Sequence, residues 1–249
     1  MAETWQEDRY RDILKTPAKN WLLNKIWRDA YEDDYPEDAD PFGFATVSDL
    51  ESISAELHLK KYSRLLDVGC GRGGPGLWVA RKTHSLLTGL DILAEAIEQA
   101  NSLKVRMGMA DAATFGIGSF ADTGLPSCSQ QAVMSVDAFW MVLDKTAALR
   151  EMARIIEPGG SLVMTTWVPR RAELEAMLIT AGFRLLSCQE TPRWKERQMA
   201  VYRGILRHRD ELERQVGPVS TGILVAEAKE AAARLGGSPR CLVVAVRQS

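Results

Sequence analysis

Residues 65–76 read Leu65-Leu66-Asp67-Val68-Gly69-Cys70-Gly71-Arg72-Gly73-Gly74-Pro75-Gly76, and this stretch decides the fold. Its apolar first half predicts a short buried strand. The glycines predict a turn, because glycine adopts positive φ angles and lets a ligand lie against the backbone. Residues 77–80 are apolar and predict a helix, whose first N–H groups point into the turn. A strand, a glycine turn and a helix in succession open a doubly wound α/β sheet, in which ligands bind at the carboxyl ends of the strands.

Two carboxylates indicate which ligand this turn binds. Three of its glycines satisfy G-x-G-x-x-G, the pattern of dinucleotide sites, but this pattern is weak by itself. Asp67 stands two residues before the first of these glycines and is expected to face the ligand, where it repels a pyrophosphate and attracts an ammonium or a sulfonium. Asp91 follows a second apolar segment, 86–90, at the distance of an acidic residue that accepts hydrogen bonds from a ribose. S-adenosylmethionine has all three groups and no phosphate, so the carboxylates favour it.

Four segments, in this order, resemble the motifs of class I S-adenosylmethionine-dependent methyltransferases: 65–76, 89–91, 133–137 and 154–166. The resemblance covers roughly residues 50–190 and is nearest to the small-molecule methyltransferases of bacterial natural-product and quinone pathways. It implies an α/β fold with a doubly wound, Rossmann-like, seven-stranded and mostly parallel sheet under a helical lid. The implied cofactor is S-adenosyl-L-methionine, with S-adenosyl-L-homocysteine as the product. The residues expected to surround it are Asp67, Gly69, Cys70, Gly71, Asp91, Ile92, Ser119, Phe120 and Asp137.

The adenine end of the cofactor site depends on where the third strand lies. Asp111 looks like the acidic residue that the family places at the end of this strand, but residues 107–110 fit a loop better. Residues 114–120 fit a strand, with its exit loop at 124–126. On this register Ser119 takes the acidic position and Phe120 packs on the adenine ring. Because a serine hydroxyl lacks charge assistance, we expect somewhat weaker cofactor binding.

The segment 137–144 lacks the histidines that many relatives have after the fourth strand. In the family, the position of Asp137 lines the pocket near the transferred methyl. Trp140 and Met141 form an apolar wall, which is either core packing or a surface for a largely apolar substrate. Further substrate residues are expected in a lid, and a general base, if the reaction needs one, must also come from the lids. The lid candidates for substrate contact are Trp27, Tyr31 and Tyr35, and those for a catalytic base are His208, Tyr31 and Tyr35.

The chain is expected to divide into an N-terminal helical lid (1–46), a cofactor-binding α/β core (47–191), a helical lid insertion (192–236) and the last strand of the core sheet (237–249). Helices are expected at 22–31, 47–59, 93–107, 145–156, 170–181, 194–215 and 220–235. The later strands are expected at 132–136, 161–166, 183–189 and 241–246. The Pro-Gly-Gly at 158–160 is expected to end a helix before the strand at 161.

Composition narrows the partners and the compartment. The formal net charge of -2 argues against nucleic acid as the main partner, and no apolar run reaches the length of a membrane span. The N-terminus has no signal-peptide pattern, and the four cysteines are scattered, which predicts reduced thiols in a cytoplasmic protein. The three histidines lie far apart, so no metal site is expected. The partner is expected to be a small-molecule substrate, and the protein a monomer or a homodimer.

Two function classes follow. The first is a methyltransferase that acts on a small, largely apolar, natural-product-like acceptor by in-line methyl transfer. The second is a cyclase or isomerase that binds S-adenosylmethionine without consuming it, and it is motivated by the missing histidines. A nicotinamide oxidoreductase depends on the glycine pattern alone.

Overall fold

The chain forms two compact units in a computed structural model that describes residues 11, 21–39, 43–235 and 237–248. Unit 1 comprises Met1–Tyr35 and Pro192–Pro239, and unit 2 comprises Pro36–Thr191 and Arg240–Ser249. Part of the predicted lid at 1–46 therefore lies outside the described residues. The glycine turn at 69–74 belongs to unit 2, which holds the candidate site.

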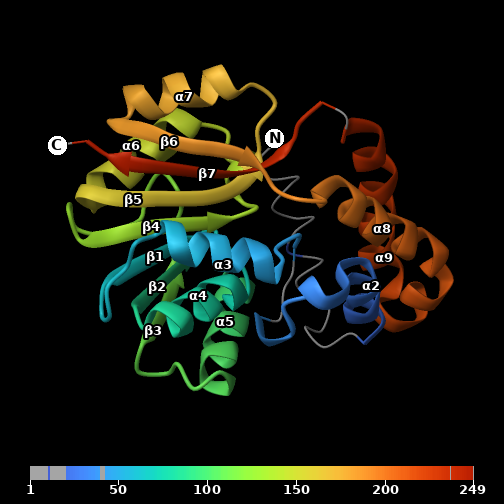
Figure 1. Ribbon diagram of the computed structural model, residues 1–249. Coiled ribbons are helices and arrows are strands. Elements are labelled where there is room, and N and C mark those ends of the chain that lie inside the picture. Colours follow the sequence, from blue (N-terminus) through green and yellow to red (C-terminus); the bar gives the residue numbers. More distant parts are fainter. Residues whose placement is uncertain (1–10, 12–20, 40–42, 236, 249) are drawn as a thin grey trace. The chain divides into compact units, whose positions relative to one another are not determined.

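Unit 2 is built on a single seven-stranded sheet with the order β3-β2-β1-β4-β5-β7-β6 (Figure 1). The strands β1 to β5 run parallel, and β7 pairs antiparallel with both β5 and β6. The doubly wound α/β sheet predicted from the sequence is confirmed. The strands are β1 (Arg64–Val68), β2 (Leu86–Asp91), β3 (Ala113–Ile117), β4 (Gln130–Val136), β5 (Ile156–Trp167), β6 (Phe183–Glu190) and β7 (Arg240–Arg247).

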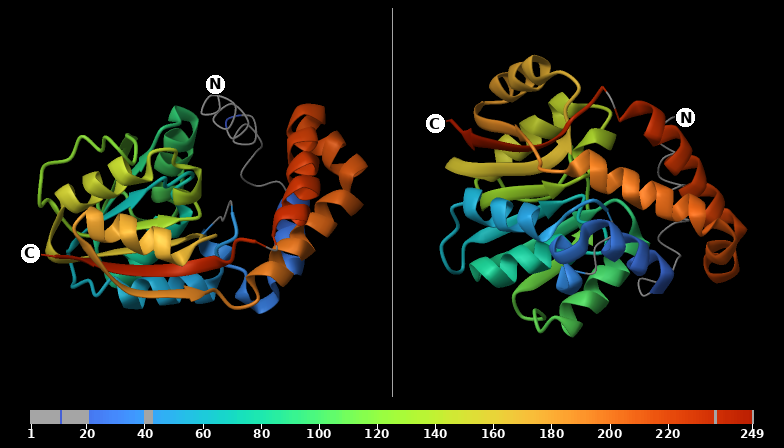
Figure 2. Two further views of the ribbon diagram at one scale, coloured as in Figure 1. Left: turned by 90° about the horizontal axis from the view of Figure 1, so that it is seen from above. Right: turned by 45° about the vertical axis from the view of Figure 1, so that its right-hand side comes forward.

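Helices cover both faces of this sheet, as the right-hand view of Figure 2 shows. One face carries α3 (Val47–Glu56), α4 (Gly74–Thr83) and α5 (Ala94–Arg106), and the other carries α6 (Lys145–Ile155) and α7 (Arg171–Thr180). Successive residues of a strand point to opposite faces, so Leu65 packs under α3 and α4 while Leu66 packs under α6. Burial on both faces explains why the inner strands are almost continuously apolar.

Two strands of unit 2 depart from the sequence prediction. The strand β3 ends at Ile117, which pairs with Asp91, whereas the prediction carried it to residue 120. The strand β5 begins at Ile156, directly after α6, and residues 157–160 form a bulge within it. The pairing with β4 shifts there from Gln130↔Ile156 to Ala132↔Ser161. The helix α6 ends at Ile155, just before the Pro-Gly-Gly sequence, as predicted. The prediction is wrong only in the start of the strand, because residues 157–160 lie in a bulge within β5 and pairing with β4 continues on both sides of them.

Unit 1 contains α2 (Trp21–Tyr31), α8 (Trp194–Arg207) and α9 (Arg209–Arg234). The helices α2 and α8 approach closely at Gly204, where a Cβ would lie 2.6 Å from Ile26 Cγ2. A shielded ion pair joins Arg197 to Asp34 at 2.7 Å. The predicted helix at 194–215 is wrong in extent, since α8 ends at Arg207. The helix α9 is interrupted in turn at Gly217, whose φ of 80° is not helical and which is followed by a proline.

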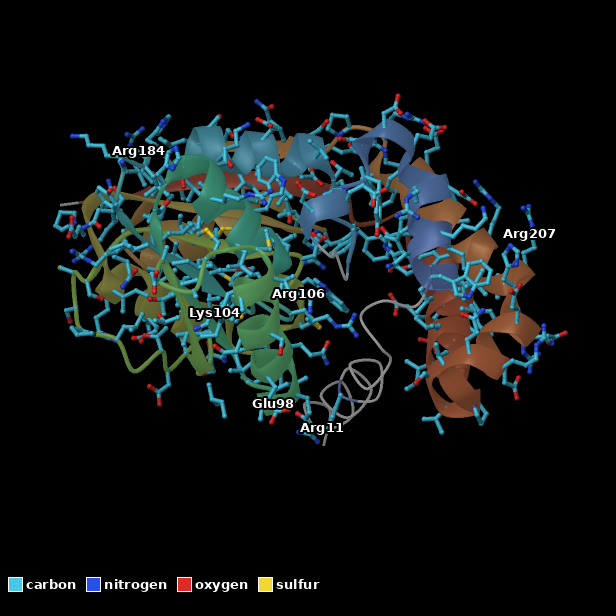
Figure 3. The ribbon with its side chains drawn as sticks, turned by 90° about the horizontal axis from the view of Figure 1, so that it is seen from below. Arg11, Glu98, Lys104, Arg106, Arg184 and Arg207 are labelled. Carbon is cyan, nitrogen blue, oxygen red and sulfur yellow. The ribbon has the colours of Figure 1, made fainter. Side chains whose placement is uncertain are left out.

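Figure 3 shows charged side chains around the outside of each unit, whereas a few others, such as Arg240 and Asp67, are buried. On α5, Glu98 and Arg106 are exposed, whereas Lys104 donates a hydrogen bond to the Ala113 carbonyl at the start of β3. No helix among the described residues has an apolar stretch long enough to cross a lipid bilayer.

Candidate functional site

The glycine turn after β1 is fastened to the end of β2. The N–H groups of Gly69 and Cys70 both donate to the Leu90 carbonyl, at 2.8 and 3.0 Å. Gly69, Gly71 and Gly73 have φ angles of 70°, 51° and 81°, a region that side chains other than glycine rarely adopt. The turn thus holds its backbone in a fixed curve at the carboxyl edge of the sheet, where the sequence predicts a ligand.

The glycines of this turn are required for different reasons. A Cβ on Gly69 would lie 2.6 Å from the Ala138 Cβ, and one on Gly73 would lie 2.8 Å from the Phe115 ring, so both positions are closed by packing. Gly71 differs, because nothing lies within 4 Å of its ideal Cβ position. The open space in front of Gly71 is where a ligand can lie against bare backbone.

Asp91 is held beside this open backbone by two amides. Its Oδ2 accepts from the Gly71 N–H at 2.8 Å, and its Oδ1 accepts from the Leu93 N–H at 3.0 Å. Burial raises the pKa of Asp91, and these amides partly oppose the rise. A carboxylate has about four acceptor sites, so each oxygen can accept a further hydrogen bond. This geometry fits the ribose hydroxyls that the sequence analysis assigned to Asp91.

Asp67 is a buried carboxylate with only 1% of its surface exposed. It lies against the first turn of α4, where a Cβ on Gly76 would be 2.5 Å from its Oδ2. Neither oxygen has a hydrogen bond of good geometry among the described residues, although the Gly76 N–H is near enough to lower the pKa of Asp67. Burial, followed by the charge of Asp91, raises its pKa to about 7, and the Gly76 amide opposes this only in part. Such an unsatisfied buried acceptor suits a cationic ligand group, but direct contact of Asp67 with the ligand stays a prediction.

The residues predicted for the adenine end lie at the ends of β2 and β3. Ile92 is half exposed. The Phe120 ring lies next to Gly69 and meets Phe139 edge-on, with their ring centroids 5.9 Å apart. The Ser119 hydroxyl accepts from the Asp122 N–H at 3.0 Å, so it is engaged in its own turn. Phe120 is thus brought to the glycine turn, while Ser119 keeps only its remaining hydrogen-bonding capacity for a ligand.

The side chains of Cys70 and Asp137 are directed elsewhere. The Cys70 Sγ lies 3.2 Å from the ideal Cβ position of Gly89 on β2, and burial raises the pKa of this thiol well above its ordinary value. Asp137 receives two hydrogen bonds from Arg240, Nε to Oδ1 at 2.8 Å and Nη2 to Oδ2 at 3.1 Å. Asp137 therefore uses its carboxylate in an ion pair. Binding of a cofactor by these two residues stays a prediction.

Three aromatic side chains gather where β4 and β5 end. Trp140 lies in a short 3-10 helix at Phe139–Met141, and its Nε1 donates to the Asp137 carbonyl at 2.9 Å. Its ring meets Trp167 edge-on at 5.8 Å, and Trp167 meets Phe44 edge-on at 6.0 Å. We call Phe44, Trp140 and Trp167 the aromatic face. Trp140 is 44% exposed, so at least part of this face is open to a ligand.

Trp140 and Met141 were predicted here from the sequence, whereas Phe44 and Trp167 were not. Met141 is half-buried. Trp167 directly follows the strand predicted at 161–166, so its position at a carboxyl end was a signal that could have found it. Arg240 was missed as well, although a charged residue at the start of the apolar final strand is itself unusual.

The candidates in unit 1 are mostly committed to packing. Tyr31 and Tyr35 are buried, and the guanidinium groups of Arg197 and Arg28 lie 6.0 and 5.2 Å from their respective ring centroids. Trp27 is half-buried, on the same helix as Tyr31. His208 follows α8, with its Nδ1 3.7 Å from a Glu211 oxygen. Roles for these residues in substrate binding or proton transfer stay predictions.

Unit 2 has two histidines, and neither lies at the carboxyl edge of its parallel strands. His84 caps α4 just before β2 begins, and His58 follows α3 before β1 begins. Both therefore lie at the amino end of the sheet. Among the described residues there is also no group of three or more His, Cys, Asp or Glu side chains that could hold a metal ion.

Comparison with known proteins gives one family. Residues 66–164 match a family model described as a methyltransferase domain. The chain is 28% identical, over 158 residues, to the 27-O-demethylrifamycin SV methyltransferase of Amycolatopsis mediterranei (strain S699), which covers 62% of this chain and 58% of that protein. This chain therefore spans about three fifths of the length of this relative.

Solved structures agree on the fold. The [4+2]-cyclase SpnF is similar with a TM-score of 0.72 and 21% identity, over 80% of this chain and 79% of that chain. The phosphoethanolamine N-methyltransferase 2 of Haemonchus contortus, solved with S-adenosyl-L-methionine, has a TM-score of 0.72 and 16% identity, over 91% of this chain and 57% of that chain. At these identities the likeness establishes only the Rossmann-like fold, and the chemistry has to be inferred from the residues of the site.

Proposed function

We propose that this chain, which belongs through residues 66–164 to the class I S-adenosylmethionine-dependent methyltransferases, transfers a methyl group from S-adenosyl-L-methionine to a small, largely apolar acceptor. One observation carries the proposal. The Asp91 carboxylate and the unobstructed backbone of Gly71 stand together at the carboxyl edge of the sheet, joined by a hydrogen bond of 2.8 Å. This pair offers acceptors for ribose hydroxyls and space for an uncharged linkage.

The residues around the turn fit this cofactor. Asp91 would hold the ribose, Phe120 and Ile92 would contact the adenine, and the negative charge of Asp67 would favour the cationic end of the ligand. The cofactor supplies a methyl group that is already activated on a sulfonium. The chain then has to bind, align and exclude water, and alignment alone can contribute about 7–11 kcal/mol.

The aromatic face supports an apolar acceptor. Phe44, Trp140 and Trp167 present aromatic surface beside the end of β4, where Asp137 is paired with Arg240. The charged group of Lys145 is also present here, and it donates to the Trp140 carbonyl at 3.3 Å and to the Val142 carbonyl at 2.6 Å. The aromatic surface itself favours an apolar ligand, because a polar group buried against it without a partner is costly. We therefore propose a natural-product-like acceptor for this site, with Trp140 and Met141 among its contacts.

No histidine of unit 2 takes part in the proposed reaction, and a general base, if the acceptor needs one, is proposed among His208, Tyr31 and Tyr35 of unit 1. His58 and His84 lie at the amino end of the sheet, so unit 2 supports transfer to a nucleophile that loses its proton to solvent or needs to lose none. The same observation is what favours the second candidate, a cyclase or isomerase in which the cofactor is not consumed. The resemblance to SpnF adds nothing to that candidate beyond the fold.

We propose the cellular compartment from the cysteines. The four cysteines are scattered along the sequence with no C-x-x-C pair, a usage that suits the reducing cytoplasm, and we place the protein there as a monomer or a homodimer.

Calorimetry and labelled methyl transfer test the proposal together. We expect micromolar binding of S-adenosyl-L-methionine and S-adenosyl-L-homocysteine, and transfer of a labelled methyl group to a member of a panel of apolar polyketide-like, terpenoid and aromatic scaffolds. Turnover of a scaffold without release of S-adenosyl-L-homocysteine would establish the second candidate. Failure of the chain to bind either compound would refute both.

A further inference from the structure

Arg240 is the largest side chain that is almost completely buried, with 1% of its surface exposed. It lies at the first position of β7 and contacts three other segments of unit 2. Besides its two hydrogen bonds to Asp137, its Nη1 donates to Asp49 Oδ2 at 2.9 Å and to Thr191 Oγ1 at 3.0 Å. The planar guanidinium is suited to this arrangement, because its five donors are fixed in a fork.

The chain crosses from one unit to the other at three points, which we call the passages, and partners of Arg240 lie at or after them. Unit 2 resumes after unit 1 at Pro36 and at Arg240 itself, and it ends at Thr191 before the chain enters unit 1. Thr191 is also tied to Arg240 by its N–H, which donates to the Arg240 carbonyl at 2.9 Å. Asp49 closes a capping box with Thr46 at the start of α3, soon after the first of these passages. Arg240 therefore joins two of the passages directly, at Thr191 and at its own position, and it holds the start of α3, the first α-helix after the other passage.

Asp137 carries the same network to the glycine turn. Its φ of 56° is a left-handed conformation, and its N–H donates to the Thr165 carbonyl of β5 at 2.9 Å. The next residue, Ala138, has its Cβ 2.6 Å from the ideal Cβ position of Gly69, so Ala138 packs directly against the turn. Asp137 Oδ2 also accepts from the Phe44 N–H at 3.3 Å, which attaches one member of the aromatic face.

Given the proposed function, we propose that Arg240 is a positioning residue that couples cofactor binding at the glycine turn to the passages between the units. It acts through Asp137 and Ala138 on the turn, and through Asp49, Thr191 and the Phe44 amide on the passages. Binding of the cofactor at the turn then stabilises the hydrogen bonds of the Phe44 and Thr191 N–H groups, although neither residue is among those assigned to the cofactor.

Residue-resolved hydrogen exchange with S-adenosyl-L-homocysteine as the probe tests this coupling. In the wild type, saturating probe is expected to slow exchange at the Phe44 and Thr191 amides at least tenfold. In Arg240→Met the slowing is lost, while the variant still binds the probe with about tenfold weaker affinity. Arg240→Lys, which keeps the charge but not the fork, provides a folded variant if the methionine variant does not fold, and it too is expected to lose most of the slowing.

Arg247→Met is the matched control. Arg247 lies at the other end of β7, at the amino edge of β5, where it donates to the Ile156 carbonyl. A purely structural role for Arg240 predicts that both methionine variants are less stable and that both keep the slowing. Slowing that survives in Arg240→Met or in Arg240→Lys overturns the proposal. Probe binding to the wild type without slowed exchange overturns it as well and leaves the proposed function intact, whereas no binding at all refutes both.

Discussion

Asp91 Oδ2 accepts a hydrogen bond of 2.8 Å from the Gly71 N–H, across 20 residues of sequence. This contact brings a carboxylate from the end of β2 onto the open backbone of the turn that follows β1. Because the amide already orients the carboxylate, the remaining acceptor sites of Asp91 are aimed before a ligand arrives. We expect these preorganised groups to bind the cofactor, and substitutions at them test this.

Asp91→Ala is expected to weaken S-adenosyl-L-homocysteine binding by roughly 10- to 150-fold, because hydrogen bonds to a charged group contribute about 1.5–3 kcal/mol. Calorimetry measures the change. Asp111→Ala is the control, since Asp111 is the exposed acidic residue that the sequence analysis rejected for the adenine contact. If Asp111→Ala weakened binding as much as Asp91→Ala, the register assigned to β3 would be incorrect.

Gly71→Ala separates the ligand space from the conformation of the turn. The methyl group meets no protein atom, so the folded chain should lose only the cost of a left-handed alanine, about 1–2 kcal/mol. A bound cofactor would meet this methyl group, and its affinity should fall at least 30-fold. Gly159→Ala is matched, because Gly159 has a φ of 81°, is equally open and lies in the β5 bulge, away from the turn. Equal affinity in both variants would show that the space at Gly71 is not used.

The sequence predicted those parts of the fold whose signals are contiguous in the chain, and it was wrong where strand pairing decides the outcome. The strand β1, the turn and the start of α4 are contiguous, so apolar residues and glycines were sufficient to predict them. The bulge at 157–160 was missed because Pro-Gly-Gly has the same composition in a break and in a bulge, and only pairing with β4 distinguishes the two. The end of β3 was overestimated because its ladder ends with β2 itself: Ile117 pairs with Asp91, and the Gly118 N–H makes one further hydrogen bond to the Asp91 carbonyl at 3.1 Å. The residue types at 118–120 do not show where the neighbouring strand ends.

The candidate site divides in the same way. Gly71 and Asp91 were predicted from spacing within one β-α-β unit. The ion pair of Asp137 with Arg240 joins positions 103 residues apart, and nothing local marks either residue as the partner of the other. The aromatic face was likewise only partly visible, since Phe44, Trp140 and Trp167 come from three separate segments.

Trp140→Ala is expected to abolish or strongly reduce methyl transfer to the acceptor while changing the affinity for S-adenosyl-L-homocysteine less than threefold. The side chain is 44% exposed, so its loss should cost the fold little. Val105→Ala, a substitution of an exposed apolar residue on α5, controls for the general effect of removing surface side chains. Unchanged KM and kcat for the acceptor in Trp140→Ala would remove this residue from the acceptor site.

Arg240→Met should lower the free energy of unfolding by about 3–5 kcal/mol, the usual cost of removing one partner from a buried ion pair. The substitution leaves two buried carboxylates, Asp49 and Asp137, without their cation. Asp49→Asn in the same background removes one of these charges and should restore part of the loss. Urea unfolding of the single and double variants measures both effects, and a double variant no more stable than Arg240→Met would argue against charge as the cause.

The pH dependence of stability should contain a component from Asp67. Its pKa is about 7 in the folded protein and has the ordinary value of 3.8 in the unfolded chain. Between these values the unfolded chain releases the proton first, so stability falls as the pH rises from about 4 to about 7, by at most roughly 1.4 kcal/mol per pH unit. Above pH 7 both states are ionised and the component is constant.

Asp67→Asn removes this component, because asparagine fills the same space without titrating. The stability of the variant relative to the wild type should therefore increase toward pH 7 and level off above it, whatever constant offset the amide introduces. Urea unfolding at pH 5, 6, 7 and 8 without cofactor measures the difference, and Asp111→Asn, an exposed carboxyl, serves as the control. Parallel stability curves for the wild type and Asp67→Asn would mean that folding does not raise the pKa of this carboxyl, which would contradict its description as a buried acceptor without adequate partners.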